Sequence, residues 1–384
     1  MKIAFVGDVA NHGKYLKTPG TSIVILLSAL KGITSVDVYC PIQNTTIEQF
    51  EPPYNVRIIQ LYEYNKPSSL FRLLKIDWND YDFVIFNMLS TGFGSSSLPN
   101  AIWLAIPIIL VKFLRLKNIR VIYHNSVYTN DIVRLGYNSP FDKVRSLVLA
   151  AIERSIFKSI KTFVFLKLYK QRIDTAIGKN KVSFLHLRYL DAVATIYANS
   201  AMDVETLEAK ESDVPTILMH GSWGPQKNIE SGLLALRRLK ESGIDFRLII
   251  SGGLNSHFSE YKKGFNNLIN EYYDIINNYK GYVEEKEVMN LFLKSDILIL
   301  PYNVPGGMSG VLDQAIFFDI PTIAVDFPEY REQTIGVNNV KLVSLDHLTN
   351  AVKEALTNYV KKRKIANKEK LHEAVTRISE IIKQ

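Results

Sequence analysis

Cysteine and long apolar runs are what this sequence lacks. Cys40 is the only cysteine among 384 residues, so no disulfide forms within the chain, which favours a reducing compartment such as the cytoplasm. One apolar stretch, residues 101–116 (AIWLAIPIILVKFLRL), has a core of about 14 apolar residues, whereas a membrane-spanning helix needs roughly 20. Pro107 and Lys112 also interrupt it. We therefore expect a buried crossover helix rather than a membrane span.

The same stretch leaves a second interpretation open, a helix lying on a membrane surface. Helices that lie at a membrane surface combine apolar and basic residues. Four basic residues lie at or after the end of this stretch: Lys112, Arg115, Lys117 and Arg120. The net charge of +8 fits either a solvated lysine-rich surface or attraction to an anionic membrane or substrate. Peripheral contact with the cytoplasmic face of the cell membrane thus stays open. Zinc-finger spacing, arginine-rich tracts and RNA-binding aromatic signatures are missing, so no nucleic-acid partner is expected.

Paired carboxylates of the kind that hold a metal are also missing. Asp80–Tyr81–Asp82 has the spacing of an Asp-x-Asp pair, but the apolar run FVIFN follows it directly. This position predicts a turn before a strand. We therefore expect catalysis without a metal or any other cofactor.

The length of the chain indicates two domains, because one core rarely serves more than about 250–300 residues. Short apolar runs alternate with helical patterns throughout, which is typical of parallel strands joined by crossover helices. The N-terminus, MKIAFVGD, predicts a first buried strand and is too short for a signal peptide. Further strands are expected in the first half at Val36–Tyr39, Arg57–Leu61, Phe83–Asn87, Arg120–His124 and Thr162–Phe165, with helices at Thr21–Leu30, Leu98–Leu114 and Asp142–Lys158.

A second series of the same kind begins near Thr216. Residues 199–214 are polar and without apolar periodicity, so we interpret them as a linker between domains 1–198 and 215–365. A helix over 366–384 could pack back on the first domain. The expected elements of the second domain are strands at Thr216–Met219, Phe246–Ser251, Ile297–Pro301 and Thr322–Val325 and helices at Asn228–Glu241, Ser259–Asn277, Glu285–Lys294 and Ser309–Phe318.

The most informative stretch is 301–326, PYNVPGGMSGVLDQAIFFDIPTIAVD. A buried strand is expected to end in a glycine-rich loop, and a helix opens near Ser309. Backbone N–H groups and the helix dipole then converge on a site suited to phosphate. Asp313, inside the helix, is placed for sugar hydroxyls rather than for phosphate, because two anions repel. The pattern predicts a nucleotide-sugar site.

A second loop in the same domain complements the first. The strand at Thr216–Met219 continues into HGSWGPQKN, in which Gly221 and Gly224 permit a tight turn. Lys227 arrives just before a helix start, where its ammonium is a point charge for a diphosphate. By itself it could also be a surface lysine beside a helix start.

Three motifs occur in order: Gly-x-x-x-Pro-x-Lys-Asn, then GYVEEKEVMNLFLKSDILILPY, then SGVLDQAIFFDIPTIAVD. Together they resemble the C-terminal domain of retaining glycosyltransferases of the GT-B fold, in the large fourth family of nucleotide-sugar-dependent enzymes (glycosyl transferases group 1). The resemblance covers most of residues 215–335. It implies an α/β chain of two Rossmann-like domains that face each other across a cleft.

The resemblance also implies roles for single residues. Lys227 would meet the donor diphosphate, Asp313 the ribose hydroxyls, and His124 the transferred sugar, which makes His124 and Lys227 the catalytic candidates. The loop Pro19-Gly20-Thr21-Ser22, with Gly20 and Thr21 at its centre, would face the phosphates and the acceptor. The other donor-binding candidates are Gly221, Ser222, Tyr282, Val283, Gly307, Met308, Ser309 and Gly310.

Two positions depart from the family pattern. Ser222 stands where the family often has an arginine, so one phosphate-binding cation is missing. Pro305 stands where a glutamate is usual, eight residues before Asp313. We interpret this loop as a variant donor site whose contacts come mainly from the backbone.

The expected function is transfer of a sugar from a nucleoside-diphosphate sugar to a hydroxyl acceptor, a glycan or a lipid-linked molecule, with retention of configuration. Front-face transfer assisted by the leaving phosphate fits the resemblance, since no nucleophilic carboxylate is indicated. Two alternatives remain: a nucleotide-sugar epimerase of the same fold, and a non-catalytic nucleotide-sugar-binding protein.

Overall fold

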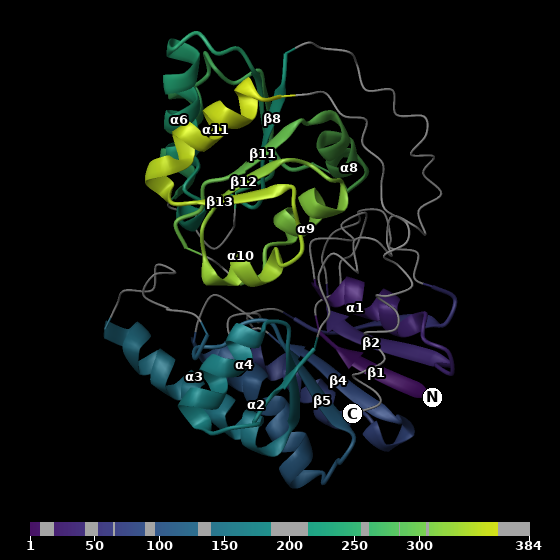
Figure 1. The fold of residues 1–384 in the computed structure, drawn as a ribbon. Coiled ribbons are helices and arrows are strands. Elements are labelled where there is room, and N and C mark those ends of the chain that lie inside the picture. Colours follow the sequence, from purple (N-terminus) through teal and green to yellow (C-terminus); the bar gives the residue numbers. More distant parts are fainter. Residues whose placement is uncertain are drawn as a thin grey trace. The chain divides into compact units, whose positions relative to one another are not determined.

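A computed structural model describes residues 1–7, 19–42, 53–63, 66–88, 97–129, 140–185, 214–254, 261–283, 285–304 and 307–359. These residues form two compact units, one within 1–199 and the other within 200–368 (Figure 1). Each unit is built on a parallel sheet covered by helices. The predicted linker 199–214, except for Val214, and the predicted helix over 366–384 lie outside the described residues.

The first unit is built on a seven-stranded parallel sheet in the order β3-β2-β1-β4-β5-β6-β7. Its strands are β1 (Lys2–Val6), β2 (Ser35–Pro41), β3 (Val56–Tyr62), β4 (Phe83–Met88), β5 (Ile119–Tyr123), β6 (Lys161–Val164) and β7 (Ser183–Phe184). The helices are α1 (Pro19–Ser28), α2 (Ser97–Phe113), α3 (Pro140–Ser159) and α4 (Lys167–Ile177), with the 3-10 turns η1 (Pro67–Lys75) and η2 (Trp78–Asp80).

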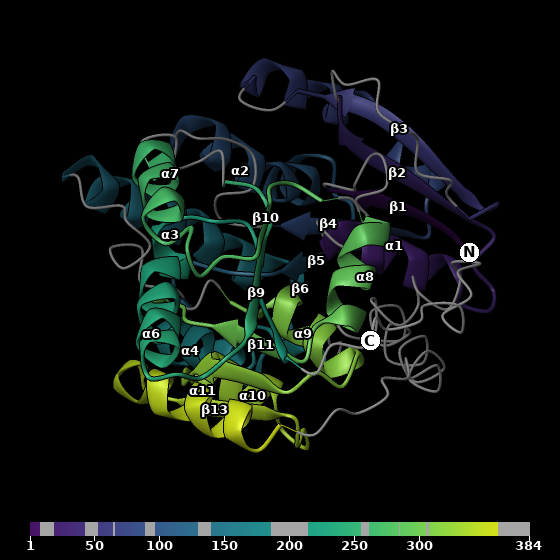
Figure 2. The same cartoon turned by 90° about the horizontal axis from the view of Figure 1, so that it is seen from above.

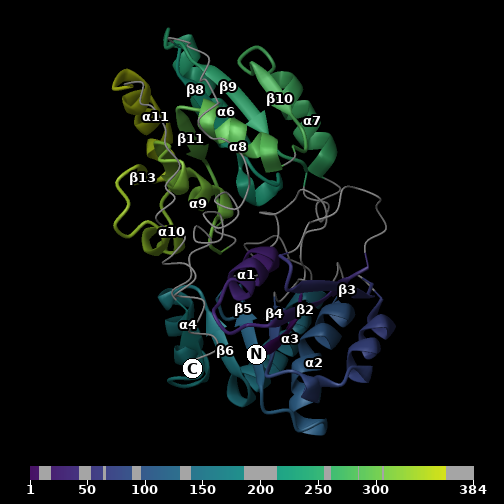
Figure 3. The same ribbon diagram turned by 90° about the vertical axis from the view of Figure 1, so that its right-hand side faces the viewer.

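Successive side chains of the central strands point to opposite faces of this sheet, and both faces are buried. Ile85 and Ile122 belong to the cluster that α1 completes with Ile23, Leu26 and Leu27. The next residues along, Phe86 and Tyr123, point to the opposite face, where Phe86 meets Trp103 of α2 and Tyr123 meets Phe157 of α3. Figure 3 shows α1 and α2 on opposite sides of the strands. Such strands read as continuous apolar runs because both faces are covered.

Helix α2 confirms the prediction of a buried crossover helix. Trp103, Leu104, Ile106 and Leu110 are buried, and Pro107 lies within the helix. The C-terminal end of the helix is not buried: Phe113, its last residue, and Leu114 after it are exposed. Among the described residues, no helix is long and apolar enough to cross a membrane.

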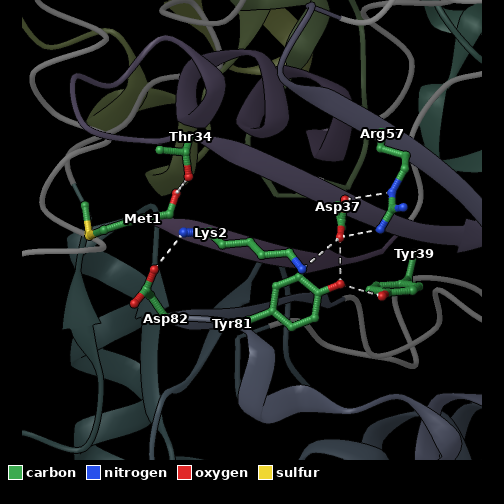
Figure 4. A network of polar contacts seen from close by, with 8 residues as sticks. All are labelled: Met1, Lys2, Thr34, Asp37, Tyr39, Arg57, Tyr81 and Asp82. Atoms are coloured by element: carbon green, nitrogen blue, oxygen red, sulfur yellow. Dashed lines mark hydrogen bonds and ion pairs between the residues drawn. The ribbon is translucent and has the colours of Figure 1, made fainter.

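A polar network joins the first three strands of this sheet at a point far from their carboxyl ends (Figure 4). The buried carboxylate of Asp37 accepts two hydrogen bonds from Arg57, at 2.9 and 2.7 Å, and one from the Tyr81 hydroxyl at 2.7 Å. Burial raises the pKa of Asp37, but these hydrogen bonds and the charges of Arg57 and Lys2 outweigh it, and the net pKa is lowered. The network is structural.

The Asp80–Tyr81–Asp82 segment forms the turn that its sequence predicts. Asp80 ends η2, and Asp82 precedes β4 and accepts a hydrogen bond from the backbone N–H of Lys2 at 2.7 Å. Among the described residues, no cluster of three histidine, cysteine or acidic side chains is arranged to hold a metal ion.

The second unit holds a six-stranded parallel sheet in the order β10-β9-β8-β11-β12-β13. Its strands are β8 (Thr216–His220), β9 (Arg247–Ser251), β10 (Asn278–Lys280), β11 (Ile297–Leu300), β12 (Thr322–Val325) and β13 (Val340–Val343). Its helices are α6 (Ile229–Glu241), α7 (Tyr261–Glu271), α8 (Glu285–Lys294), α9 (Gly310–Phe317), α10 (Pro328–Gln333) and α11 (Leu348–Thr357), with the turns η4 (Pro225–Lys227) and η6 (Leu345–His347).

Helices α6 and α11 pack side by side on one face of this sheet, and α8 and α9 lie on the other (Figure 1). Figure 2 shows α7 beside α6, where Arg237 of α6 bonds to Asp274 just beyond α7. The first face buries the apolar stripe of α6 that its sequence periodicity predicts, at Ile229, Leu233, Leu236 and Leu239.

The structure corrects several element boundaries. The helix predicted over Ser259–Asn277 ends at Glu271, because the chain must turn back to form the edge strand β10. The strand predicted over Arg120–His124 ends at Tyr123, which leaves His124 in the following loop. Five further elements were not expected from sequence: the helices α4 and α10 and the strands β7, β10 and β13. The three strands lie at sheet edges and are short or only partly buried, so their apolar signal is weak.

Candidate functional site

The strand order of the second unit marks a ligand site before any side chain is considered. From β8 the chain adds β9 and β10 on one side, and it then crosses to add β11, β12 and β13 on the other. The switch point therefore lies between β8 and β11. Open parallel sheets bind ligands outside the carboxyl ends of the strands at such a point. The loops that begin at Gly221 and at Pro301 leave the sheet there.

The backbone is closely packed where β8 and β9 end. Gly221 N–H donates to the Ser251 carbonyl at 3.2 Å, and Trp223 N–H donates to the Gly253 carbonyl at 2.8 Å. Gly252 has φ +107°, and a Cβ there would lie only 1.8 Å from the Gly221 carbonyl oxygen. Only glycine fits Gly252, which sequence reasoning did not single out. Ser222, in the family's arginine position, is exposed.

Lys227 ends the turn η4 and sits directly before α6. Its N–H donates to the Gly224 carbonyl at 2.9 Å, and Asn228 adopts a left-handed conformation, φ 44°, that starts the helix. The Gln226 carbonyl accepts a hydrogen bond from Asn303 N–H at 3.2 Å. This bond ties the loop after β8 to the loop after β11, so the two predicted halves of the donor site are brought together.

The Lys227 ammonium lies over the ring of Tyr302, with Nζ 3.6 Å from the ring centroid. This is a cation–π contact, and it replaces an ion pair: among the described residues no carboxylate lies within ion-pair distance of Lys227. Burial lowers the pKa of Lys227 to about 7. A partly buried cation at the switch point, with no counter-ion among the described residues, is suited to an anionic ligand.

The glycine-rich loop leads into α9 with well-defined contacts. Ser309 caps the helix, its Oγ accepting from Leu312 N–H at 3.3 Å, while Gly307 has φ +107°. The side-chain amide of Gln333, in α10, makes two hydrogen bonds to the backbone of Ser309. Its Oε1 accepts from Ser309 N–H at 3.0 Å, and its Nε2 donates to the Ser309 carbonyl at 2.9 Å. The Ser309 amide is thus already paired. Met308 and Gly310 are partly exposed, and Pro305 and Gly306 lie outside the described residues.

Asp313 is fully buried, and its Oδ1 accepts a hydrogen bond from Gln333 Nε2 at 2.7 Å. This hydrogen bond connects α9, which carries Asp313, to α10, which ends at Gln333. Gln333 was not among the residues predicted from sequence, since it lies 20 residues beyond Asp313 and follows no motif. The contact with ribose stays a prediction.

Tyr282 and Val283 lie between β10 and α8, near the same end of the sheet. Tyr282 is half exposed, and its Cβ is the nearest atom to where a Cβ on Gly253 would lie, at 3.8 Å. Val283 is buried. The resemblance implies that this segment lies beside the nucleobase of the donor, and that contact stays a prediction.

In the first unit, His124 follows β5 and is held by its neighbour strand. Nε2 lies 2.6 Å from Asn87 Oδ1, and the ring packs on Phe165 with 4.8 Å between centroids. Burial lowers the pKa of His124 to about 3, so the imidazole is neutral at physiological pH. A neutral ring whose Nε2–H donates to Asn87 has Nδ1 as a hydrogen-bond acceptor.

The loop after His124 is fixed by a buried carboxylate that sequence reasoning missed. Glu153 of α3 accepts from the Ser126 hydroxyl at 2.6 Å, the Tyr123 hydroxyl at 2.9 Å and Val127 N–H at 3.1 Å. In the sequence, Glu153 could be recognised only by its place on the helix face that packs against the sheet, where a carboxylate is unusual. Gly20 and Thr21 lie in the first turn of α1, both buried.

These observations can be compared with known families and folds. Residues 205–372 match the model of the family described as "Glycosyl transferases group 1". No curated protein sequence matches the chain.

Solved structures share the whole architecture. Sucrose-phosphate synthase from Thermosynechococcus elongatus is 16% identical, with a TM-score of 0.64 over 100% of this chain and 94% of that one. HepE from Anabaena, in complex with UDP-glucose, is 12% identical, with a TM-score of 0.61 over 100% and 98%. A UDP-GlcNAc 2-epimerase from Methanocaldococcus jannaschii is 16% identical, with a TM-score of 0.57 over 100% and 99%.

Two helix-covered parallel sheets in one chain, shared with these structures, are the GT-B fold, which confirms the predicted fold class. The match to the glycosyl transferases group 1 model covers residues 205–372, which hold all three motifs, and it confirms the resemblance that those motifs carry.

Proposed function

We propose that this protein transfers a sugar from a nucleoside-diphosphate sugar to a hydroxyl acceptor, with retention of the anomeric configuration and without a metal. The observation that carries the proposal is the unpaired Lys227 ammonium at the switch point of the second sheet, joined through Gln226 and Asn303 to the glycine-rich loop. A related structure, HepE from Anabaena, holds UDP-glucose, which makes UDP the first nucleotide to test.

In the proposed reaction the protein stabilises the leaving nucleoside diphosphate. The bond between the anomeric carbon and the phosphate oxygen breaks while negative charge grows on the phosphate. Lys227 and the positive end of α9 lie where this charge would be, and their contribution is larger in the transition state than in the ground state. The acceptor hydroxyl would attack the same face, giving its proton to the leaving phosphate. His124, neutral and with one ring nitrogen unprotonated, would accept a hydrogen bond from the transferred sugar.

The Lys227→Ala variant tests this assignment. We expect UDP affinity and turnover of the donor to fall by an order of magnitude or more, because one charge-assisted contact to the diphosphate is lost. Calorimetric titration with UDP and release of UDP from a panel of UDP-sugars measure both quantities. Lys294→Ala, an exposed lysine at the end of α8, is the control. An unchanged UDP affinity in Lys227→Ala would contradict the proposal.

A nucleotide-sugar epimerase is the second candidate, because a UDP-GlcNAc 2-epimerase shares the fold at full coverage. An epimerase converts its donor in the absence of acceptor, whereas a transferase requires one. Incubation with labelled UDP-sugars alone, followed by analysis of the sugar, separates the two. A protein that binds UDP tightly and changes no donor in either assay would be the non-catalytic alternative.

We also propose that the acceptor is carried by a lipid at an anionic membrane. The support is the exposed end of α2, where Phe113 and Leu114 are flanked by Lys112 and Arg115, together with the net charge of +8. Apolar side chains between basic ones are suited to the headgroup region of a bilayer. Co-sedimentation with anionic vesicles measures such contact.

A further inference from the structure

The buried hydroxyl of Tyr302, in the second unit, has no hydrogen-bond partner among the described residues. Tyr302 follows β11 directly and is 1% exposed, yet its Oη makes no hydrogen bond of normal geometry with any described residue. A phenol that is removed from water without a partner costs folding free energy. Buried unpaired polar atoms are uncommon in folded proteins, and where one lies beside a candidate binding site a ligand can supply its missing partner.

The surroundings show where this hydroxyl points. A Cβ on Gly221 would lie 3.4 Å from Tyr302 Oη, so the hydroxyl faces the glycine loop after β8. Burial raises the pKa of Tyr302, and the side chain of Ser309 lowers it, which places the hydroxyl near the cap of α9 as well. It stays protonated at every physiological pH, so it can donate a hydrogen bond to an acceptor that arrives.

The ammonium of Lys227, at the same place, also lacks an anionic partner. Its Nζ rests on the face of the Tyr302 ring, and among the described residues no carboxylate lies within ion-pair distance of it. The hydroxyl and the ammonium both offer protons, and both are held on one ring system. An anion with several oxygens satisfies them together.

We propose that Tyr302 is a substrate-binding residue: its hydroxyl donates a hydrogen bond to a non-bridging oxygen of the donor diphosphate, while its ring holds Lys227 over the same group. The inference rests on the proposed function and adds to it a contact that no motif predicts. The family often has a phosphate-binding arginine at the position of Ser222, and the Tyr302 hydroxyl would supply part of that missing contact. Because phosphate charge grows as the nucleoside diphosphate leaves, the hydrogen bond strengthens in the transition state.

The Tyr302→Phe variant separates binding from structure, because the two roles predict opposite signs. Phenylalanine keeps the ring, its packing and the contact with Lys227, and it removes only the unpaired hydroxyl. We expect the ligand-free variant to melt at the same temperature as the wild type or higher. We expect its affinity for UDP to fall roughly 5- to 20-fold, and its affinity for uridine to stay the same.

Tyr272→Phe is the matched control, since Tyr272 is also buried in this unit and carries a cation, Arg237, 3.8 Å above its ring. It should leave both affinities unchanged. Equal UDP affinity in Tyr302→Phe and wild type would overturn the inference, as would an equal loss for UDP and uridine or a lower melting temperature with unchanged affinity. If the wild type binds none of UDP, GDP and ADP, the proposed function itself fails, and this inference fails with it.

Discussion

At the scale of the residue, burial changes the pKa values of two side chains of the candidate site. Among the described residues, neither Lys227 nor His124 has an opposite charge beside it, and burial lowers the pKa of each, to about 7 and about 3. The consequences differ. His124 is neutral at all physiological pH values, so it acts through hydrogen bonds alone. Lys227 titrates in the physiological range and couples the binding of an anion to a proton.

This coupling predicts a pH dependence for UDP binding. Protonated Lys227 favours the diphosphate, and the free protein loses that proton as the pH rises through about 7, so affinity should fall by up to about tenfold for each unit above 7. Binding at pH 8 should take up a proton, which calorimetry in two buffers of different ionisation enthalpy detects. The range pH 7 to 9 is chosen because a terminal phosphate is already ionised there. Lys227→Arg should lack the dependence, and a flat wild-type profile would contradict the assignment.

At the scale of the element, the ends of β8 and β9 position the donor loops. Gly221 lies against Gly252, and the two strand ends approach closely because neither residue carries a side chain. The periodic apolar runs predicted β8, β9, β11 and β12 correctly to within one or two residues. The crowding between their loops was not predictable, because it depends on strands 31 residues apart in sequence lying side by side at the register His220 to Ser251.

Gly252→Ala should therefore harm both stability and binding. A Cβ at 1.8 Å from the Gly221 carbonyl oxygen forces the two strand ends apart, and we expect a loss of about 2 kcal/mol or more in the free energy of unfolding. UDP affinity should fall with it. Gly243→Ala is the control, since Gly243 also has positive φ, +82°, but open space around it; we expect a loss of about 1 kcal/mol or less. Urea unfolding measures both, and equal losses would show that the close contact is unimportant.

At the scale of the whole molecule, charge and exposed apolar groups bear on where the protein works. The net charge is +8, and the end of α2 exposes Phe113 (77%) and Leu114 (48%). We expect the protein to co-sediment with vesicles containing phosphatidylglycerol at low salt and to be released at 0.5 M salt, roughly five times the concentration at which surface charges are already screened over about 10 Å.

The double variant Phe113→Ser/Leu114→Ser should weaken vesicle binding about tenfold or more, because two apolar side chains no longer enter the headgroup region. Phe71→Ser, which removes another exposed apolar side chain of the same unit, should not. Absence of vesicle binding at low salt, or equal binding by both variants, would refute the membrane proposal.

The sequence by itself determined the α/β architecture, the resemblance of the second unit to glycosyl transferases group 1, and the two glycine-containing loops proposed to hold the donor. Apolar periodicity is a local property, and glycine, proline and lysine at the ends of apolar runs indicate a loop's chemistry without knowledge of its neighbours. The tertiary structure alone decided which loops meet. Tyr302 looks like an ordinary aromatic residue after a strand, and Gln333 like an ordinary surface glutamine. Strand order places β8 beside β11, and burial then turns a hydroxyl without a partner and a lysine without a counter-ion into features of a binding site.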